Sequence, residues 1–245
     1  MSTIEGRNAV IEALRAGIPL SRVTIAEGTK PDRALDEIVS RAAEAGIAVD
    51  HAPKRVLDSK SERGAHQGVI AEAKPYKYAS LDDVLARAEG KPASLVIALD
   101  HITDPGNLGA IVRTAEVVGA DGMLVANRRA AAVTPAAYKA SAGALAHVAL
   151  AQEANLVRSL AKCKQAGYWI VGASEHAEQT VWEAPLEGRV VLVMGSEGEG
   201  LARLTRETCD FLVRLPQAGK VGSLNVAQAT TAIAYEWLRR SANAK

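Results

Sequence analysis

The sequence predicts an α/β protein in two parts, a small α/β domain over residues 1–74 and a larger domain over residues 81–245 that is built on a parallel sheet. The first 74 residues alternate short helical and strand-like segments. Residues 75–80 contain a proline and have no apolar periodicity, which is typical of a linker. Beyond the linker, continuous apolar runs alternate with helical segments, as expected for strands that are buried on both faces of a parallel sheet.

The spacing of apolar residues predicts each element of the first part. Apolar residues at helical spacing predict helices, and short β-branched runs bounded by turn residues predict strands. In chain order we expect a helix, a strand, a helix, a strand, a short helix and a strand, over Ile4–Ala16, Arg22–Glu27, Asp32–Ala45, Ile47–His51, Arg55–Lys60 and Gly68–Ala73.

The larger part starts with a helix at Leu81, and four apolar runs predict its buried strands. These runs are Leu95–Leu99, Met123–Ala126, Trp169–Ala173 and Val190–Met194. Because ligands of open parallel sheets bind at the carboxyl ends of the strands, the informative loops are those after Leu99, Met194 and Leu215.

Composition excludes several classes of function. The chain has 245 residues with 29 basic and 28 acidic side chains, so it carries no polybasic coat, and its 9 aromatic residues are too few for broad base-stacking platforms. Cys163 and Cys209 stand alone, which predicts neither a metal site nor a disulfide framework. Charges near the start and the lack of a long apolar run predict a cytoplasmic protein without a signal peptide or membrane helix.

The loop after Leu99 ends at Asn107, before a predicted helix over Leu108–Gly119. Asparagine is a leading N-cap residue, so a structural role alone would explain Asn107. Arg113 could likewise pair with Glu116 one turn further along the helix. Both residues are also candidates for chemistry, because they follow the carboxyl end of a buried strand.

The loop after Met194 is rich in glycine, but its GxxGxG spacing and the missing lysine argue against a phosphate-binding loop. Glu197 and Glu199 would repel a pyrophosphate. They favour a ligand that is neutral or cationic near its reacting centre, such as a sulfonium, although solvated turn residues would look the same.

The loop after Leu215 contains a proline and two glycines and precedes a final helix over Val226–Arg240. Asn225 with Gln228 has the spacing of a capping box. The final helix carries one apolar stripe, which predicts either core packing or a self-association face. The stripe consists of Val226, Ile233, Ala234, Trp237 and Leu238.

Taken together, the three loops resemble motifs 1, 2 and 3 of the SpoU (TrmH) branch of the SPOUT methyltransferases. The matching segments are Asn107–Ala115, Leu192–Leu201 and Leu215–Ala227, in the family's order. Near the end of the first part, Arg63–Ile70 resembles the signature of the L30e-like RNA-binding domain that precedes the catalytic domain in this branch. The resemblance implies an L30e-like domain over 1–74, a linker over 75–80 and a trefoil-knotted catalytic domain over 81–245.

The resemblance also implies the site. Asn107, Arg113, Glu197, Ser223 and Asn225 would be the catalytic residues, and Gly195, Leu215 and Leu224 would bind S-adenosylmethionine, with no metal. The three matching segments contain no histidine that could act as the base. Because an arginine pKa above about 12 leaves little neutral guanidine, we expect Arg113 to stabilise the developing alkoxide, while a base role stays open.

Substrate recognition is expected in the first domain, where a local basic excess surrounds residues 51–66. The predicted RNA-binding residues are Lys54, Arg55, Lys60, Arg63 and His66. On charge alone, a solvated helix face would explain the same residues.

The domain order and the first residues are most similar to the members that methylate a guanosine ribose in the peptidyl-transferase region of 23S rRNA. The resemblance therefore implies an S-adenosylmethionine-dependent homodimer that acts on 23S rRNA or its precursor, with no membrane partner. Two alternatives stay open: a tRNA ribose 2′-O-methyltransferase, and a non-catalytic RNA-binding or ribosome-assembly protein.

Overall fold

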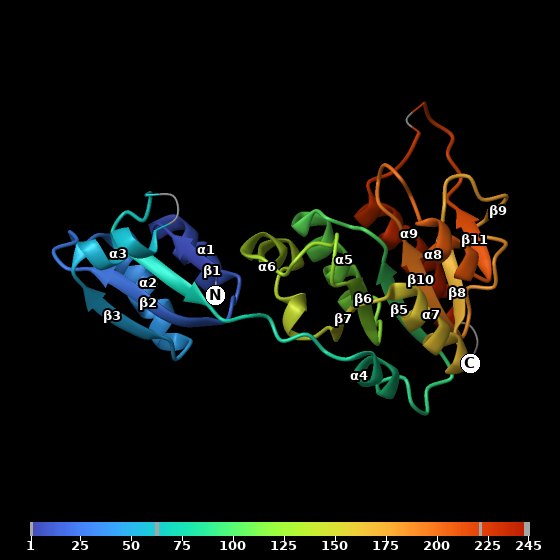
Figure 1. The fold of residues 1–245 in the computed structure, drawn as a ribbon, viewed down its shortest axis with the longest axis horizontal. Coiled ribbons are helices and arrows are strands. Elements are labelled where there is room, and N and C mark those ends of the chain that lie inside the picture. The colour runs from blue at the N-terminus through green and yellow to red at the C-terminus, as the bar shows by residue number, and fades with distance from the viewer. Residues whose placement is uncertain (1, 62–63, 221, 243–245) are drawn as a thin grey trace. The chain divides into compact units, whose positions relative to one another are not determined.

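The computed structural model describes residues 2–61, 64–220 and 222–242. The chain divides into two compact units. The first comprises Met1–Lys77 with Val133–Lys139, and the second comprises Tyr78–Ala132 with Ala140–Lys245. Figure 1 colours the first 77 residues blue to cyan and the rest of the chain green to red.

The first unit contains a four-stranded sheet in the order β1-β4-β2-β3. Its strands are β1 (Ser2–Glu5), β2 (Leu20–Ala26), β3 (Ala48–Ala52) and β4 (Val69–Ala73). Only the β2–β3 pairing is parallel. Its helices are α1 (Arg7–Arg15), α2 (Arg33–Glu44) and α3 (Lys54–Lys60).

The predicted start of the first helix is wrong. Residues 2–5 form strand β1, in which Ile4 lies opposite Ala71 of β4. Gly6, with a φ of 93°, then turns the chain into α1. A positive φ does not fit a right-handed helix, so Gly6 sets the boundary that apolar spacing alone could not locate.

The second unit contains a seven-stranded sheet in the order β7-β6-β5-β10-β8-β11-β9. All of its strand pairs are parallel, which confirms the predicted fold class. The strands are β5 (Ser94–Leu99), β6 (Gly122–Ala126), β7 (Leu150–Glu153), β8 (Trp169–Ala173), β9 (Gln179–Thr180), β10 (Arg189–Met194) and β11 (Phe211–Arg214). The trefoil knot stays a prediction from the family.

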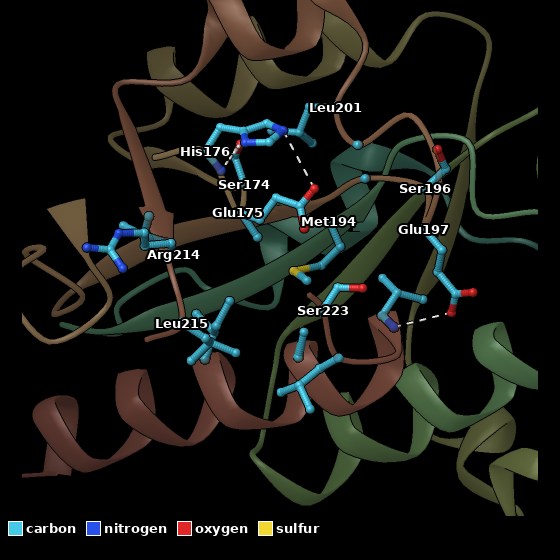
Figure 2. A pocket seen from close by; sticks show the side chains of 18 of the residues that line it. Ser174, Glu175, His176, Met194, Ser196, Glu197, Leu201, Arg214, Leu215 and Ser223 are labelled. Carbon is cyan, nitrogen blue, oxygen red and sulfur yellow. Dashed lines mark hydrogen bonds and ion pairs between the residues drawn. The ribbon is translucent and has the colours of Figure 1, made fainter. Parts of the chain in front are cut away.

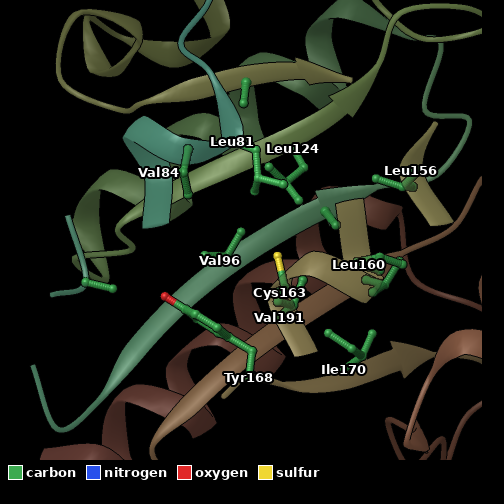
Figure 3. Close-up of a cluster of buried hydrophobic side chains, with 14 of the residues drawn as sticks. Leu81, Val84, Val96, Leu124, Leu156, Leu160, Cys163, Tyr168, Ile170 and Val191 are labelled. Atoms are coloured by element: carbon green, nitrogen blue, oxygen red, sulfur yellow. The ribbon is translucent and has the colours of Figure 1, made fainter. Parts of the chain in front are cut away.

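Helices cover both faces of this sheet. They are α4 (Leu81–Ala86), α5 (Pro105–Val117), α7 (Leu156–Gln165), α8 (Arg203–Thr208) and α9 (Val226–Ala242). Between β6 and β7 the chain also forms α6 (Pro135–Ser141), most of which belongs to the first unit, and a 3-10 turn (Ala144–Ala146). Residues of α4 and α7 pack on alternate residues of β5 and β10, including Val96 and Val191 (Figure 3). Helices α5 and α9 pack on each other, with α5 also against β6 and α9 against β10. Burial on both faces explains why these strands are continuously apolar.

Strands β7, β9 and β11 were not predicted from the apolar runs. Strand β9 has two residues, and β7 and β11 each have four, with only part of each strand fully buried. Such short, partly buried strands, which lie at or next to the edges of the sheet, do not produce a continuous apolar run. The apolar stripe of the final helix is core packing: Val226, Ile233, Ala234 and Trp237 are all buried.

Glu236 forms ion pairs with two arginines near the end of α9. Its buried carboxylate accepts hydrogen bonds from Arg239 Nε at 2.8 Å and from Arg240 Nε at 2.7 Å. These bonds, together with the two positive charges, lower the pKa of Glu236 to about 2. The carboxylate therefore stabilises the folded chain above its ordinary pKa of 4.5, and this stabilisation is lost as the pH falls through about 2.

Glu236→Gln is expected to lower the free energy of unfolding at pH 7 by about 2 kcal/mol, because a charged acceptor is lost. The difference from the wild type should shrink below pH 4.5 and vanish near pH 2. Chemical denaturation at several pH values measures it. Glu207→Gln is the control, since its pair with Arg203 is exposed. A Glu236→Gln deficit that is independent of pH would contradict this assignment.

Within the described residues, no helix combines the length and apolarity needed to cross a membrane. The same residues contain no cluster of three or more His, Cys, Asp or Glu side chains arranged to hold a metal ion.

Candidate functional site

A cavity of about 430 Å³ opens at the carboxyl ends of strands β8, β10 and β11. Three loops line most of it, over residues 173–176, 194–201 and 213–217 with Gly219, Ser223 and Leu224, and Arg206 of α8 and the first turns of α9 complete it. Figure 2 shows Glu197 and Ser223 on one side of the cavity and His176 and Arg214 on the other. The cavity thus lies where a parallel sheet is expected to bind its ligand.

The loop after β10 folds back tightly on itself. Ser196 and Gly200 exchange two backbone hydrogen bonds, with N···O distances of 3.1 and 3.0 Å. A Cβ atom on Gly195 would lie 2.2 Å from the carbonyl carbon of Gly200, so no other residue fits there without moving the loop. The glycines therefore bring the backbone close together and project Glu197 from the turn, rather than forming a phosphate cradle.

The carboxylate of Glu197 joins the three predicted motifs. Its Oε1 accepts hydrogen bonds from Asn107 Nδ2 at 3.1 Å and from Asn225 Nδ2 at 2.8 Å. Asn225 Nδ2 also lies 2.9 Å from Asn107 Oδ1, and the amide of Val226 is 3.4 Å from Glu197 Oε1. Side chains that are 90 and 28 residues apart from Glu197 thus form one polar cluster.

The structure decides between the roles considered for the two asparagines. Helix α5 begins at Pro105, and its N-cap is Asp104, whose carboxylate accepts the amide of Asn107 at 2.7 Å. The N-cap prediction for Asn107 is therefore wrong, and its side chain is available to Glu197. Asn225 does cap α9, since its Oδ1 accepts the amide of Ala227 at 2.9 Å, while its amide group serves the cluster.

Asp100 supports this arrangement, although sequence reasoning did not single it out. It is buried, at 2% exposure, at the end of β5. Its Oδ2 accepts the amide of Ala202 at 2.7 Å, and its Oδ1 lies 2.6 Å from Nδ1 of His101. The carboxylate thus fixes the far end of the loop that carries Glu197. The only sequence signal is an acidic residue directly after a buried strand.

Arg113 is not part of the cavity wall. It lies on the exposed surface of α5, two helical turns beyond Asn107, and shows no hydrogen bond or ion pair with another described residue. The expected pair with Glu116 is absent from the described side chains. Within a single chain, the structure therefore brings together Asn107, Glu197 and Asn225 but leaves Arg113 apart from them.

The predicted cofactor residues line the cavity. Gly195, Leu215 and Leu224 are part of its wall, together with Ser223. Met194, Leu201 and Ile233 add apolar surface. Sequence reasoning missed the polar side chains of the opposite wall, which come from the loop after β8, from α8 and from the end of β11: Ser174, Glu175, His176, Arg206 and Arg214. Such a mixed wall suits a ligand with one flat apolar part and several polar groups.

Neither cysteine is available for nucleophilic chemistry. Burial raises the pKa of the Cys163 thiol and of the Cys209 thiol to about 12. A thiolate is therefore scarce at neutral pH, which excludes these two residues as covalent catalysts.

The residues predicted to bind RNA differ in their placement in the first unit. Lys54 and Arg55 are exposed at the start of α3. Lys60 is also exposed, but its ammonium group pairs with Glu72 at 2.7 Å and lowers the pKa of that carboxyl. Arg63 lies outside the described residues.

His66 does not fit its predicted role. It is 4% exposed, its Nδ1 accepts the amide of Gly68 at 3.0 Å, and its Nε2 lies 2.8 Å from Asp58 Oδ1. Since Nδ1 accepts, Nε2 carries the proton and donates it to Asp58. A histidine with both nitrogens engaged and its ring buried holds the turn before β4 and has no surface for RNA.

Two family models match the chain in tandem. Residues 3–79 match the model described as RNA 2′-O ribose methyltransferase substrate binding. Residues 94–235 match the model of the SpoU rRNA Methylase family. The second match contains all three segments of the cavity and the Asn107–Glu197–Asn225 cluster.

Curated relatives and solved structures agree with these matches. An uncharacterized tRNA/rRNA methyltransferase of Mycobacterium avium is 42% identical over 97% of this chain and 77% of its own length. The SpoU methyltransferase AviRb from Streptomyces viridochromogenes, solved with AdoMet, superposes with a TM-score of 0.68 at 25% identity, over 97% of this chain and 89% of that chain. The TrmH/SpoU tRNA modifying enzyme of A. aeolicus reaches a TM-score of 0.56 at 27% identity, over 65% of this chain and 81% of that chain.

Proposed function

We propose that this chain, which belongs to the SpoU family of RNA methyltransferases, methylates the ribose 2′-hydroxyl of a guanosine in 23S rRNA. The methyl donor is S-adenosylmethionine. The observation that carries the proposal is the meeting of Asn107, Glu197 and Asn225 beside the cavity. Three distant parts of the chain supply one polar cluster next to one ligand-sized cavity.

The cavity fits such a donor. Its apolar residues, among them Leu215, Leu224 and Ile233, can cover an adenine ring, and the closely packed backbone at Gly195 leaves peptide groups for polar contacts. When bound, S-adenosylmethionine supplies an electrophilic methyl group on a cationic sulfonium. The negative charge of Glu197 on this wall favours a cation over a phosphate. The carboxylate also holds Asn107 and Asn225 in place, so that their amide groups can orient the attacking ribose.

Arg113 is proposed to act across a dimer. It is exposed on α5 and does not reach the cavity of its own chain. The same helix packs on α9, where the Thr114 and Thr231 hydroxyls meet at 2.7 Å, and one turn further Val117 and Tyr235 are 56% and 48% exposed. Burying this apolar surface against a second copy would form a homodimer. Arg113 would then stabilise the developing alkoxide in the partner's site, while a phosphate or water accepts the proton.

The first unit favours ribosomal RNA as the substrate. It matches a substrate-binding model over residues 3–79, and on α3 it exposes two cations, Lys54 and Arg55, that have no partner among the described residues. The tRNA modifying enzyme of A. aeolicus covers only 65% of this chain. A tRNA substrate remains the second candidate, because the curated relatives carry both substrates in their name. An RNA substrate of either kind agrees with a cytoplasmic location.

The test supplies purified protein with labelled S-adenosylmethionine and either unmodified 23S rRNA fragments or unmodified tRNA. We expect label in the 23S fragments. Label in tRNA alone would support the second candidate. Calorimetry with S-adenosylmethionine, run in parallel, separates an enzyme from a non-catalytic RNA-binding protein, which has no reason to bind the donor.

A further inference from the structure

We propose that the loops after β6 and β7, together with the first turn of α7, form a phosphate-binding surface. Through it the second unit binds the RNA backbone next to the methylated ribose. The surface consists of Arg128, Arg129 and Arg158. This inference rests on the proposed function, since it assigns to the catalytic unit its own contact with the RNA substrate.

Arg128, Arg129 and Arg158 are exposed, and none has a side-chain hydrogen bond or ion pair with another described residue. Several other cations of the same unit are paired. Lys162, Lys164 and Arg203 are neutralised by Asp82, Asp210 and Glu207. Arginines left without partners at the surface are available for an anion, and a guanidinium fork matches phosphate geometry.

Backbone hydrogen bonds hold the loops that carry these arginines next to the segment that leads to the catalytic cluster of Asn107, Glu197 and Asn225. The amide of Asn127 donates to the carbonyl of Glu153 at 2.9 Å, which holds the loops after β6 and β7 side by side. The amide of Ala131 donates to the carbonyl of Ile102 at 2.7 Å, which ties the first of these loops to the segment that leads into α5 and Asn107. The loops after β7, β6 and β5 are therefore neighbours, and they connect the region of Arg158 with the catalytic cluster.

The loop between these two bonds has an unusual backbone. Arg129 has a φ of 52°, in the left-handed region that residues other than glycine seldom occupy. Such a conformation persists where surrounding contacts hold it, and here both ends of the loop are fixed. Because both ends of this loop are held by backbone hydrogen bonds, the backbone of Arg129 has a defined position.

Charge differs between the two sides of the catalytic cluster. On the β10 and β8 side, the loops carry the exposed acids Glu197, Glu199 and Glu175, and the cavity wall there also contains Arg206 and Arg214. On the β6 and β7 side lie the three unpaired arginines, where the half-buried Glu153 carboxylate accepts a hydrogen bond from Ser159 at 2.7 Å. A polyanion would therefore approach the cluster across β6 and β7, and the sulfonium would occupy the acidic side.

The test compares three variants of the full-length chain by RNA binding at several salt concentrations. The first replaces Arg128, Arg129 and Arg158 with alanine. Each phosphate contact contributes about 0.7 to the slope of log K against log salt on single strands, so the slope should become shallower by about 2. The affinity for S-adenosylmethionine should not change, because none of the three residues lines the cavity.

The matched control replaces Lys162, Lys164 and Arg203 with alanine, which removes the same charge from the same unit. These side chains are already paired, so the slope should stay at the wild-type value. A third variant with lysine at 128, 129 and 158 keeps the charge and should restore most of the slope. If the alanine variant at 128, 129 and 158 shows the same salt slope as the wild type, the inference is overturned. It is also overturned if the control variant loses as much of the slope as this alanine variant. If the wild type itself methylates no RNA, the proposed function fails, whereas an active wild type with unchanged slopes refutes only the phosphate-binding surface.

Discussion

Arg113→Ala is expected to slow methyl transfer by about a hundredfold or more, comparable to the removal of one oxyanion donor, whereas Arg113→Lys retains part of the activity. The reason is that the attacking 2′-oxygen develops negative charge, and Arg113 is the one cation of the first matched motif. The side chain is exposed and makes no bond within its own described chain, so the folded state should lose little stability. Single-turnover rates at saturating RNA measure the effect.

Glu116→Ala, an exposed change on the same helix, is the matched control and should leave the rate near that of the wild type. An Arg113→Ala variant with wild-type turnover would exclude the role. The dimer can be tested in the same series, since chains with Arg113→Ala and chains with Glu197→Ala should complement each other when mixed. With random pairing half of the dimers are mixed, and one of their two sites is intact, so about a quarter of the wild-type activity should return.

Glu197→Ala is expected to lower the rate by about a hundredfold, because misplacing reacting groups by a fraction of an ångström to 1 Å has effects of that size. The substitution removes the acceptor shared by Asn107 and Asn225, at 3.1 and 2.8 Å. Glu197→Gln keeps one acceptor oxygen and should retain more activity. Rates are measured at saturating donor, so that a change in donor affinity is not read as a change in chemistry.

Glu199→Ala is the comparison for Glu197→Ala, because it removes another exposed acid from the same loop. The backbone amide of Glu199 donates to Ser196 Oγ at 3.3 Å, and its carboxylate has no hydrogen bond with another described residue. We expect a much smaller loss than for Glu197→Ala. Equal losses in the two variants would show that Glu197 contributes only loop charge, and that the cluster does not orient the reactants.

The sequence predicts the type of this fold better than its arrangement. Continuous apolar runs identify four of the seven parallel strands, since burial on both faces leaves a clear pattern. They do not reveal that β10 lies between β5 and β8, because strand order depends on long-range packing. That order places the loop after β10 next to the loop after β5, which is the condition for Glu197 to meet Asn107.

The residues of the candidate site could also be predicted from the sequence only in part. The motifs point to Asn107, Glu197 and Asn225, but local spacing assigns Asn107 as an N-cap, and only the helix start at Pro105 shows that Asp104 takes that place. His66 was grouped with basic surface residues by its neighbours in sequence, whereas its ring is buried against Asp58. A charge count cannot distinguish a paired cation such as Lys60 from an unpaired one such as Arg128.

The most direct test of the central claim is the position of the transferred methyl group. RNA that has been labelled by the wild-type protein is hydrolysed with alkali, which needs a free 2′-hydroxyl to cleave the adjacent phosphodiester. If the three loops place a guanosine ribose for attack, the label will remain in alkali-resistant dinucleotides that contain 2′-O-methylguanosine. Label released instead in mononucleotides with a methylated base would contradict the account.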